Sequence, residues 1–176
     1  MIELLSEYWR QIGLNFQHRQ IDRSLQEIRA SAGLTDMTVW HADRSTDILF
    51  PPQPFWYVPM HIGWEECHWN EWARYYLTNG KLGEKPKKEI RKLHAWWITM
   101  QTKVDEAQQI DMGKKILRSN AENLWTVGTV GLTPMPVVIR PEMRNVPKMG
   151  YWGWDGRFSA PLHPETWFFD KKRKGK

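Results

Sequence analysis

A chain of 176 residues with 41% hydrophobic and 26% charged residues is long enough for one globular domain, so its composition excludes disorder throughout. It contains no run of about 18 apolar residues, and charged residues interrupt its N-terminal segment, so neither a membrane-spanning helix nor a signal peptide is predicted. The single cysteine, Cys67, excludes an intramolecular disulfide and leaves the compartment undetermined.

The net charge of +5 is partly due to the basic run KKRKGK at residues 171–176. Short charged termini are usually solvated, so we predict a solvated tail and no nucleic-acid partner, with a tail-led nucleic-acid-binding domain as a weaker alternative. The 12 tryptophans are more informative. Tryptophan suits stacking against flat ligand faces, so this number favours rings that contact a ligand.

The N-terminal part of the chain alternates between two kinds of pattern. Apolar residues at helical spacing predict a helix over 2–12, and Asp22 is a suitable N-cap for a second helix that ends near Gly33. The alternation over 14–19 and the apolar run over 37–40 each predict a strand. The order helix, strand, helix, strand favours an α/β layer with right-handed crossovers.

The central part predicts a loop followed by three helices. Four prolines among aromatic residues predict that residues 50–63 form an irregular surface loop that presents its rings. Helices are predicted over 66–77, from Pro86 onward, and over 105–123, and the last two form a helical hairpin. Gly113 is expected to weaken the last helix, whose buried residues are predicted to be Ala107, Ile110, Ile116 and Leu117.

The C-terminal part predicts little regular structure. Two short strands are expected over 125–130 and 136–139, on either side of a turn that contains Gly and Pro. Residues 140–169 contain Pro, Gly and aromatic residues without a clear period, so we expect a segment that packs on another surface.

The region around Cys67 contains residue types that bind metals, namely His61, Glu65, Glu66, Cys67 and His68. Adjacent residues point in different directions on a helix or strand, and no CxxC or HExxH pattern completes a set of four ligands. We therefore interpret these residues as surface polar groups and predict no metal and no cofactor.

The stretch DMTVWHADRSTD, residues 36–47, changes abruptly from apolar to polar at the end of a predicted strand. A carboxylate nucleophile, Asp43, assisted by His41 is one interpretation, and a small hydrolase is the alternative function. A triad of Ser45, His41 and Asp43 is disfavoured because three neighbours on one strand do not easily converge. Phosphoryl transfer is disfavoured because no Gly-rich anion loop is found.

The location of this stretch is more informative than its residue types. In open α/β layers, ligands bind beyond the carboxyl ends of the strands, which is where Trp40, His41 and Asp43 are predicted to lie. The alternative is that Trp40 belongs to the core and Asp43 to a turn. We predict no catalytic residue and a ligand-binding site that contains Trp40, His41, Asp43, Trp56 and Trp64.

Several stretches, taken in order, resemble a known family. They are residues 3–24, 36–47, 85–147 and the closing HPETWFF at 163–169. Together they are similar to the C-terminal part of the family 5 extracellular solute-binding proteins of ABC importers, which bind dipeptides, oligopeptides or nickel and have relatives that bind oligosaccharides. The similarity covers nearly the whole chain and depends on the order of moderately specific segments.

The resemblance implies an α/β fold in which two lobes close on a ligand, a periplasmic binding protein of type II, cluster C-like. Residues 1–140 would belong to the second, C-terminal lobe, and residues 141–176 would return toward the first lobe. It also implies that Asp43 pairs with a peptide's α-amino group beside Trp40. The chain departs from the peptide binders at Arg44, where they have an aromatic residue, so an oligosaccharide is the competing ligand.

A complete family member is several times longer, so the resemblance predicts that this chain is a fragment with one wall of a cleft. Ligand is normally trapped between two walls, so we expect weak binding by this piece alone. Exposed apolar surface would favour self-association. The implied function is solute recognition for import, without enzymatic activity, in the periplasm or outside the cell, with the ABC permease subunits as partners of the full-length protein.

Overall fold

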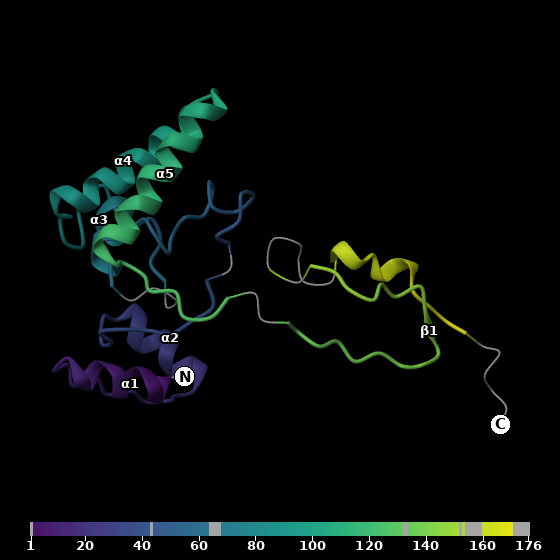
Figure 1. Cartoon of the computed structure of the whole chain (residues 1–176). Helices are drawn as coiled ribbons and strands as arrows, with labels where there is room; N and C mark the ends of the chain where they lie inside the picture. The colour runs from purple at the N-terminus through teal and green to yellow at the C-terminus, as the bar shows by residue number, and fades with distance from the viewer. Residues whose placement is uncertain are drawn as a thin grey trace.

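The computed structural model describes residues 2–42, 44–63, 68–131, 134–151, 153 and 160–170. The described helices are α1 (Ile2–Gln11), α2 (Arg23–Ser31), α3 (Asn70–Leu77), α4 (Lys88–Thr102) and α5 (Glu106–Asn123), with the 3₁₀ turns η1 (Ala160–Leu162) and η2 (Pro164–Thr166). Two short strands, β1 (Met143–Arg144) and β2 (Phe168–Phe169), complete the described elements. Figure 1 shows α1 and α2 below the group formed by α3, α4 and α5, with the C-terminal segment extending away from both.

The helices begin where local capping groups are available. The side chain of Asp22 accepts a hydrogen bond from the Ser24 amide at 2.8 Å, which confirms the predicted N-cap of α2. The side chain of Asp105 accepts from the Ala107 amide at 3.0 Å in the same way and begins α5. At the other end of α5, Leu124 adopts a left-handed conformation with φ of 53° and closes the helix.

The core is built on the antiparallel hairpin of α4 and α5. Its buried residues come from α4, α5 and the segment before α3, and they are Val58, Trp69, Ile90, Leu93, Met100 and Ile116. The predicted burial of Ala107, Ile110 and Leu117 was wrong, because Ile110 is 48% exposed, Leu117 is 46% exposed and Ala107 is also exposed. Helix α5 therefore contacts the core through a narrow stripe at Gly113 and Ile116.

Gly113 has a role in packing, although glycine has a low helix propensity. A Cβ atom at this position would lie 3.3 Å from Cε1 of Phe50 and 3.7 Å from Sδ of Met100. The bare backbone of α5 thus leaves room for the Phe50 ring, which packs against the core cluster. Gly113 weakens the helix as a local element but permits its close contact with the preceding loop.

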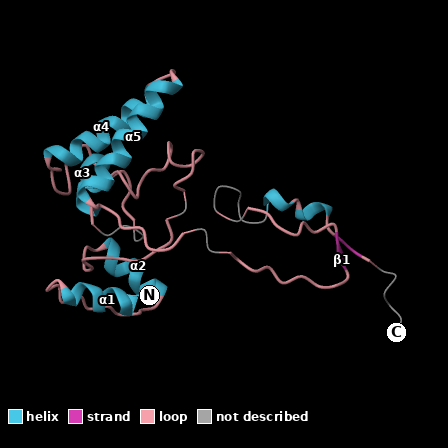
Figure 2. Ribbon diagram, in the orientation of Figure 1, coloured by secondary structure: helices cyan, strands magenta, loops and turns pink. Residues whose placement is uncertain are grey.

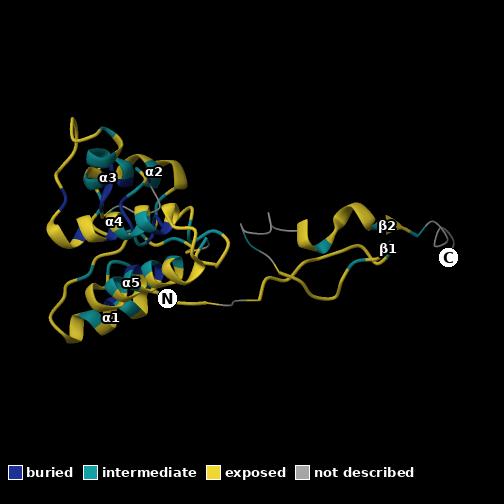
Figure 3. Cartoon of the chain, turned by 90° about the horizontal axis from the view of Figure 1, so that it is seen from above, coloured by how far each residue is buried: buried dark blue, intermediate teal, exposed yellow. Residues whose placement is uncertain are grey.

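The segment over 50–63 is irregular, as predicted, but the prediction that it lies on the surface and presents its rings was wrong. Phe55 and Trp56 are only 6% and 5% exposed, and Val58 is fully buried. The Trp97 indole of α4 donates a hydrogen bond to the Pro51 carbonyl at 3.1 Å, which attaches the segment to the hairpin. Val58 belongs to the core cluster and Phe50, Tyr57 and Met60 pack against it, so this segment completes the core. Figure 3 shows buried residues among the helices, whereas the C-terminal segment is mostly exposed.

The strands predicted over 14–19, 37–40, 125–130 and 136–139 are not formed in the described chain. These segments lack regular structure and run as loops in Figure 2. A strand requires a neighbour to satisfy its backbone groups, and none of these segments has one here. The described chain does form one two-stranded sheet. This sheet neither confirms nor excludes the α/β class, and the class and the lobe boundaries stay predictions.

The C-terminal segment forms a small unit of its own. Strands β1 and β2 are antiparallel, with Met143 opposite Phe169 and Arg144 opposite Phe168. Near their ends, Arg144 and Asp170 form an ion pair at 3.4 Å. Figure 1 shows this unit apart from the helices, and the basic run 171–176 lies outside the described residues. None of the helices in the described ranges has the length and apolarity needed to cross a bilayer.

An aromatic stack joins α3 to α4. The Tyr76 and His94 rings are nearly parallel, with centroids 3.7 Å apart, and Trp97 meets His94 edge-on at 5.5 Å. Burial disfavours the imidazolium and so lowers the pKa of His94 below its usual value. Burial also raises the pKa of Tyr76, an effect that the positive charge of Arg91 opposes.

Replacing Ile116 by Ala should lower the free energy of unfolding by about 2–5 kcal/mol, because the side chain is fully buried and its loss leaves a cavity. The adjacent Leu117→Ala, at a half-exposed position of the same helix, should cost less than about 1 kcal/mol. Urea unfolding of both variants measures the difference, and equal losses would show that α5 does not pack through the Ile116 stripe.

The lowered pKa of His94 predicts a pH-dependent contribution to stability. Its folded pKa lies below the unfolded value of about 6.5, so the unfolded chain binds more protons between these two values. The contribution is complete above about pH 6.5 and declines as the pH falls toward the folded pKa. His94→Phe keeps an aromatic ring without this titration, so its urea stability should fall less than that of the parent chain on acidification.

Candidate ligand-binding site

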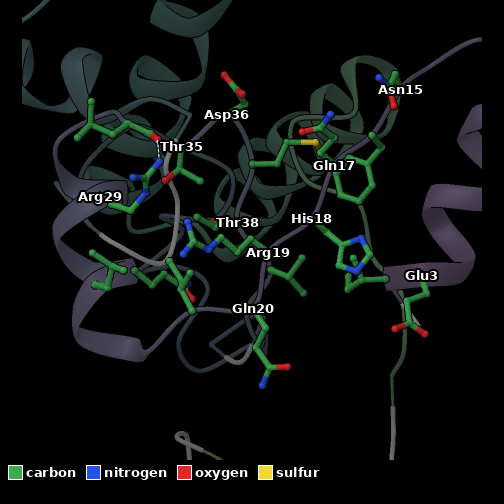
Figure 4. Close-up of a pocket in the computed structure, with 18 residues that line it drawn as sticks. Glu3, Asn15, Gln17, His18, Arg19, Gln20, Arg29, Thr35, Asp36 and Thr38 are labelled. Carbon is green, nitrogen blue, oxygen red and sulfur yellow. Dashed lines mark hydrogen bonds between the residues drawn. The ribbon is translucent and has the colours of Figure 1, made fainter.

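A groove of about 940 Å³ lies between the start of α1, helix α2 and two non-helical segments, 15–21 and 34–39. We call this the groove throughout. Figure 4 shows His18 and Glu3 on one side of it and Arg29 and Thr35 on the other. Its lining residues are Ile2, Glu3, Asn15, Phe16, Gln17, His18, Arg19, Gln20, Ile21, Leu25, Gln26, Arg29, Leu34, Thr35, Asp36, Met37, Thr38 and Val39.

The two non-helical segments bring backbone polar groups to the groove. Within the described chain, residues 17–20 and 35–37 make no hydrogen bonds through their main-chain N–H or C=O groups. Backbone groups of this kind need a partner, which is either water or another extended chain. Two segments that line the groove therefore contain main-chain groups that lack a partner in the described chain.

The side chains of the groove carry both signs of charge. Arg19 and Arg29 supply positive charge, whereas Glu3 and Asp36 supply carboxylates. His18 is held in place by a hydrogen bond between its Nδ1 and the Ser6 hydroxyl at 3.2 Å. A lining with both signs suits a ligand that itself carries an amine and a carboxylate.

Helix α2 and the turn after it position one wall of the groove. Gly33 has a φ of +69°, a conformation that glycine adopts without strain, and it turns the chain directly after the helix. The Arg29 guanidinium donates a hydrogen bond to the Leu34 carbonyl at 3.1 Å and fixes the start of the second segment. The wall is therefore set by the end of α2.

A buried asparagine ties this wall to the rest of the protein. Asn70 is 3% exposed and lies at the start of α3. Its amide nitrogen donates to the carbonyls of Ala30 and Gly63, both at 2.9 Å. Its amide oxygen accepts from the Gly63 N–H at 3.0 Å. One side chain thus joins the end of α2, the segment before α3 and α3 itself.

The predicted site residues are only partly brought together. Trp40 directly follows the groove residue Val39, and its ring is 5.7 Å from the Arg23 guanidinium carbon. The exposed His41 ring lies 4.9 Å from Trp40. Trp56 belongs to the buried segment, with its ring 5.2 Å from that of Phe55, so a ligand would reach it only if that segment moved. The predicted Asp43 and Trp64 lie outside the described residues.

The residues that the sequence interpretation missed are the charged groups of the groove, Arg19, Arg29 and Asp36. A signal existed for two of them. Arg19 belongs to the alternating segment, and Asp36 opens the stretch in which Trp40 was singled out. Arg29 gave no such signal because it resembles any exposed helical arginine, and its hydrogen bond to the Leu34 carbonyl is not evident from the sequence.

Several residues that were considered for catalysis or metal binding contact other groups in the described chain. The Ser45 hydroxyl lies 3.3 Å from the Tyr57 hydroxyl, a partner outside the triad considered above. His61 and His68 each contact an aromatic ring, of Phe55 and Trp69 respectively. Across the described residues, no three His, Cys, Asp or Glu side chains are grouped as metal ligands, whereas Glu65, Glu66 and Cys67 lie outside them.

No protein-family model matches the chain, and no curated protein matches it either.

Asn70→Ala should lower the free energy of unfolding by at least about 2 kcal/mol, because it leaves two carbonyls and one amide without their buried partner. Asn123→Ala removes an exposed asparagine that donates to the Ser119 carbonyl, and should cost less than about 1 kcal/mol. Urea unfolding compares the two variants.

A third variant, Asn70→Asp, separates the two directions of hydrogen bonding. Aspartate can still accept from the Gly63 amide but cannot donate to the Ala30 and Gly63 carbonyls, and it buries a charge. It should therefore be no more stable than Asn70→Ala. Full stability of Asn70→Asp would show that the two donated bonds do not hold the wall.

Proposed function

We propose that this chain is the solute-binding part of an ABC importer and that the groove binds a short peptide in an extended conformation. The observation that carries the proposal is the pair of groove segments, 15–21 and 34–39, whose main-chain groups at 17–20 and 35–37 have no partner within the described chain. The similarity of residues 3–24 and 36–47 to the family 5 solute-binding proteins supports the same class.

A peptide suits these segments because its backbone N–H and C=O groups can form hydrogen bonds with those of the segments. An extended chain adds to a free strand edge through main-chain hydrogen bonds, which give affinity with little dependence on its side chains. The groove volume of about 940 Å³ is in the range of ligand sites in proteins. A general peptide importer needs this kind of recognition, in which many sequences are accepted.

The charges of the groove support a ligand with free termini. Arg19 and Arg29 can pair with a carboxylate, and Asp36 can pair with an amine. The family resemblance adds Asp43 as the partner of the α-amino group, and Trp40, at the end of the second segment, as its aromatic neighbour. In this proposal the amine end of the peptide lies toward Trp40.

An oligosaccharide is the competing ligand, and the positions of the tryptophans favour the peptide. Sugars are usually bound by stacking on aromatic rings. Most tryptophans within the described ranges pack in or against the core: Trp56, Trp69, Trp72, Trp96, Trp97 and Trp125. Phe16 is the aromatic ring of the groove lining, where no tryptophan is present.

In the proposed role the protein captures its ligand and passes it on unchanged, so it is not an enzyme. The site of action is the periplasm or the outside of the cell, and the receiving partners are the ABC permease subunits. Exposed apolar residues of α1, among them Leu4 and Tyr8, and Ile12 directly after the helix offer a surface for self-association.

Asp43→Ala should weaken the binding of free-amine tripeptides to pentapeptides about tenfold or more, because a hydrogen bond to a charged group contributes about 1.5–3 kcal/mol. Titration followed by NMR detects the weak binding expected of this chain. N-acetylated peptides should bind the variant and the parent chain equally, because they lack the charged amine.

Asp47→Ala is the matched control, since it removes an exposed carboxylate four residues further along. It should leave peptide affinity unchanged. Binding of oligosaccharides but of no peptide would replace the proposed ligand, and equal affinities of the parent chain and Asp43→Ala for every peptide would remove Asp43 from the site.

A further inference from the structure

A second charged surface lies away from the groove, on the loop between α3 and α4 and on the first turn of α4. Six exposed basic residues gather within residues 81–92, and none of them lines the groove. We call these residues the basic patch: Lys81, Lys85, Lys87, Lys88, Arg91 and Lys92. The same stretch contains two acidic residues, Glu84 and Glu89, so positive charge is in clear excess.

The charges of the basic patch are not neutralised by ion pairs with other described residues. Elsewhere such pairs are common, for example Arg23 with Glu27 at 2.8 Å and Lys115 with Asp111 at 2.8 Å. Neither Glu84 nor Glu89 forms one with the patch in the described chain. The patch therefore presents a concentrated positive field to solvent.

The loop that carries the first of these residues is held in a fixed shape. The Thr78 hydroxyl donates to the Arg74 carbonyl of α3 at 2.8 Å and accepts from the Leu82 amide at 2.9 Å. The Glu84 amide donates to the Glu71 carbonyl of α3 at 3.1 Å. Gly83, with φ of +82°, lies so close to α3 that a Cβ atom would overlap the Glu71 carbonyl oxygen.

This fixed loop exposes apolar side chains beside the basic residues. Leu82 is 60% exposed between Lys81 and Lys85, and Leu77, at the end of α3, is 58% exposed. The bonds through Thr78 fix the backbone of Leu82, so its exposure does not come from an unconstrained loop. An apolar side chain fixed in water beside unpaired cations indicates a partner that is both apolar and anionic.

The loop and α4 present their charges together because α3 packs on α4. The stack of Tyr76 on His94, at 3.7 Å, brings the end of α3 to the first turns of α4, where Arg91 is near enough to influence the pKa of Tyr76. On α4, Lys88, Arg91 and Lys92 have the spacing of one helical face. The opposite face, with Ile90 and Leu93, is buried.

We infer that the basic patch with Leu82 is a docking surface for an anionic lipid bilayer. Basic residues near such a surface each raise affinity about fivefold, and an inserted apolar side chain adds a second signal. Stable attachment usually requires two signals of this kind. Nucleic acid could pair with the cations but offers no apolar layer for Leu82 and Leu77. A lipid bilayer could contact both the basic residues and the exposed leucines.

Co-sedimentation with lipid vesicles tests this inference on the full chain. The chain should bind vesicles of phosphatidylcholine with about one-third phosphatidylglycerol, and not vesicles of phosphatidylcholine alone, with an affinity that falls at high salt. The triple variant Lys85→Gln, Lys87→Gln, Lys88→Gln should lose about a hundredfold in affinity. Leu82→Ser should lose several-fold without changing the salt dependence.

The matched control removes the same charge elsewhere, as Lys103→Gln, Lys114→Gln, Arg140→Gln, three exposed positions outside the patch. Each triple variant is also prepared with Lys171, Lys172, Arg173 and Lys174 replaced by Gln, so that the basic tail does not mask the result. Equal losses in the two triple variants would overturn the inference. Patch-dependent binding of a single-stranded oligonucleotide in the absence of vesicle binding would also overturn it.

Discussion

The arrangement of this protein depends on the hydrogen bonds of one buried amide. Asn70 connects the end of α2 to α3 and to the segment before it, at 2.9–3.0 Å in each case. The α4–α5 hairpin, by contrast, is held by apolar packing of Leu93, Ile116 and their neighbours. Because hydrogen bonds are directional and apolar contacts are not, Asn70 sets the position of the groove wall more narrowly than packing would.

The two proposed surfaces differ in whether their main-chain groups are hydrogen-bonded. Main-chain groups at 17–20 and 35–37 have no hydrogen-bond partner within the described chain, so the proposed ligand of the groove is another extended chain. The loop before α4 has its backbone groups tied to α3 through Thr78 and Glu84, so it offers side chains instead. Unpaired main chain suits a ligand of variable sequence, whereas a rigid loop with projecting Leu82 and lysines suits a fluid surface.

Much of the helical structure was predictable because its determinants are local. Asp22 is adjacent in sequence to the helix it caps, and the hairpin of α4 and α5 follows from apolar spacing. The predicted strands were wrong because a strand needs a second segment to pair with. The alternation over 14–19 gives no information about whether such a partner exists. The burial of Trp56 was missed because prolines usually indicate a surface loop, whereas here they shape a cover for α4. In the groove, Arg29 was not singled out, because an exposed helical arginine gives no distinguishing signal in the sequence. Trp40 directly follows the groove residue Val39, and its role in ligand binding stays a prediction.

The link between Ala30 and Asn70 has a consequence for the order in which the chain folds. The two residues are 40 positions apart, whereas α4 and α5 are neighbours in sequence and can form their hairpin through contacts of low sequence separation. During synthesis the groove segments leave the ribosome before α3 and lack the side chain that anchors them until α3 has emerged. We therefore expect the wall of the groove to reach its final position only after α3 has formed.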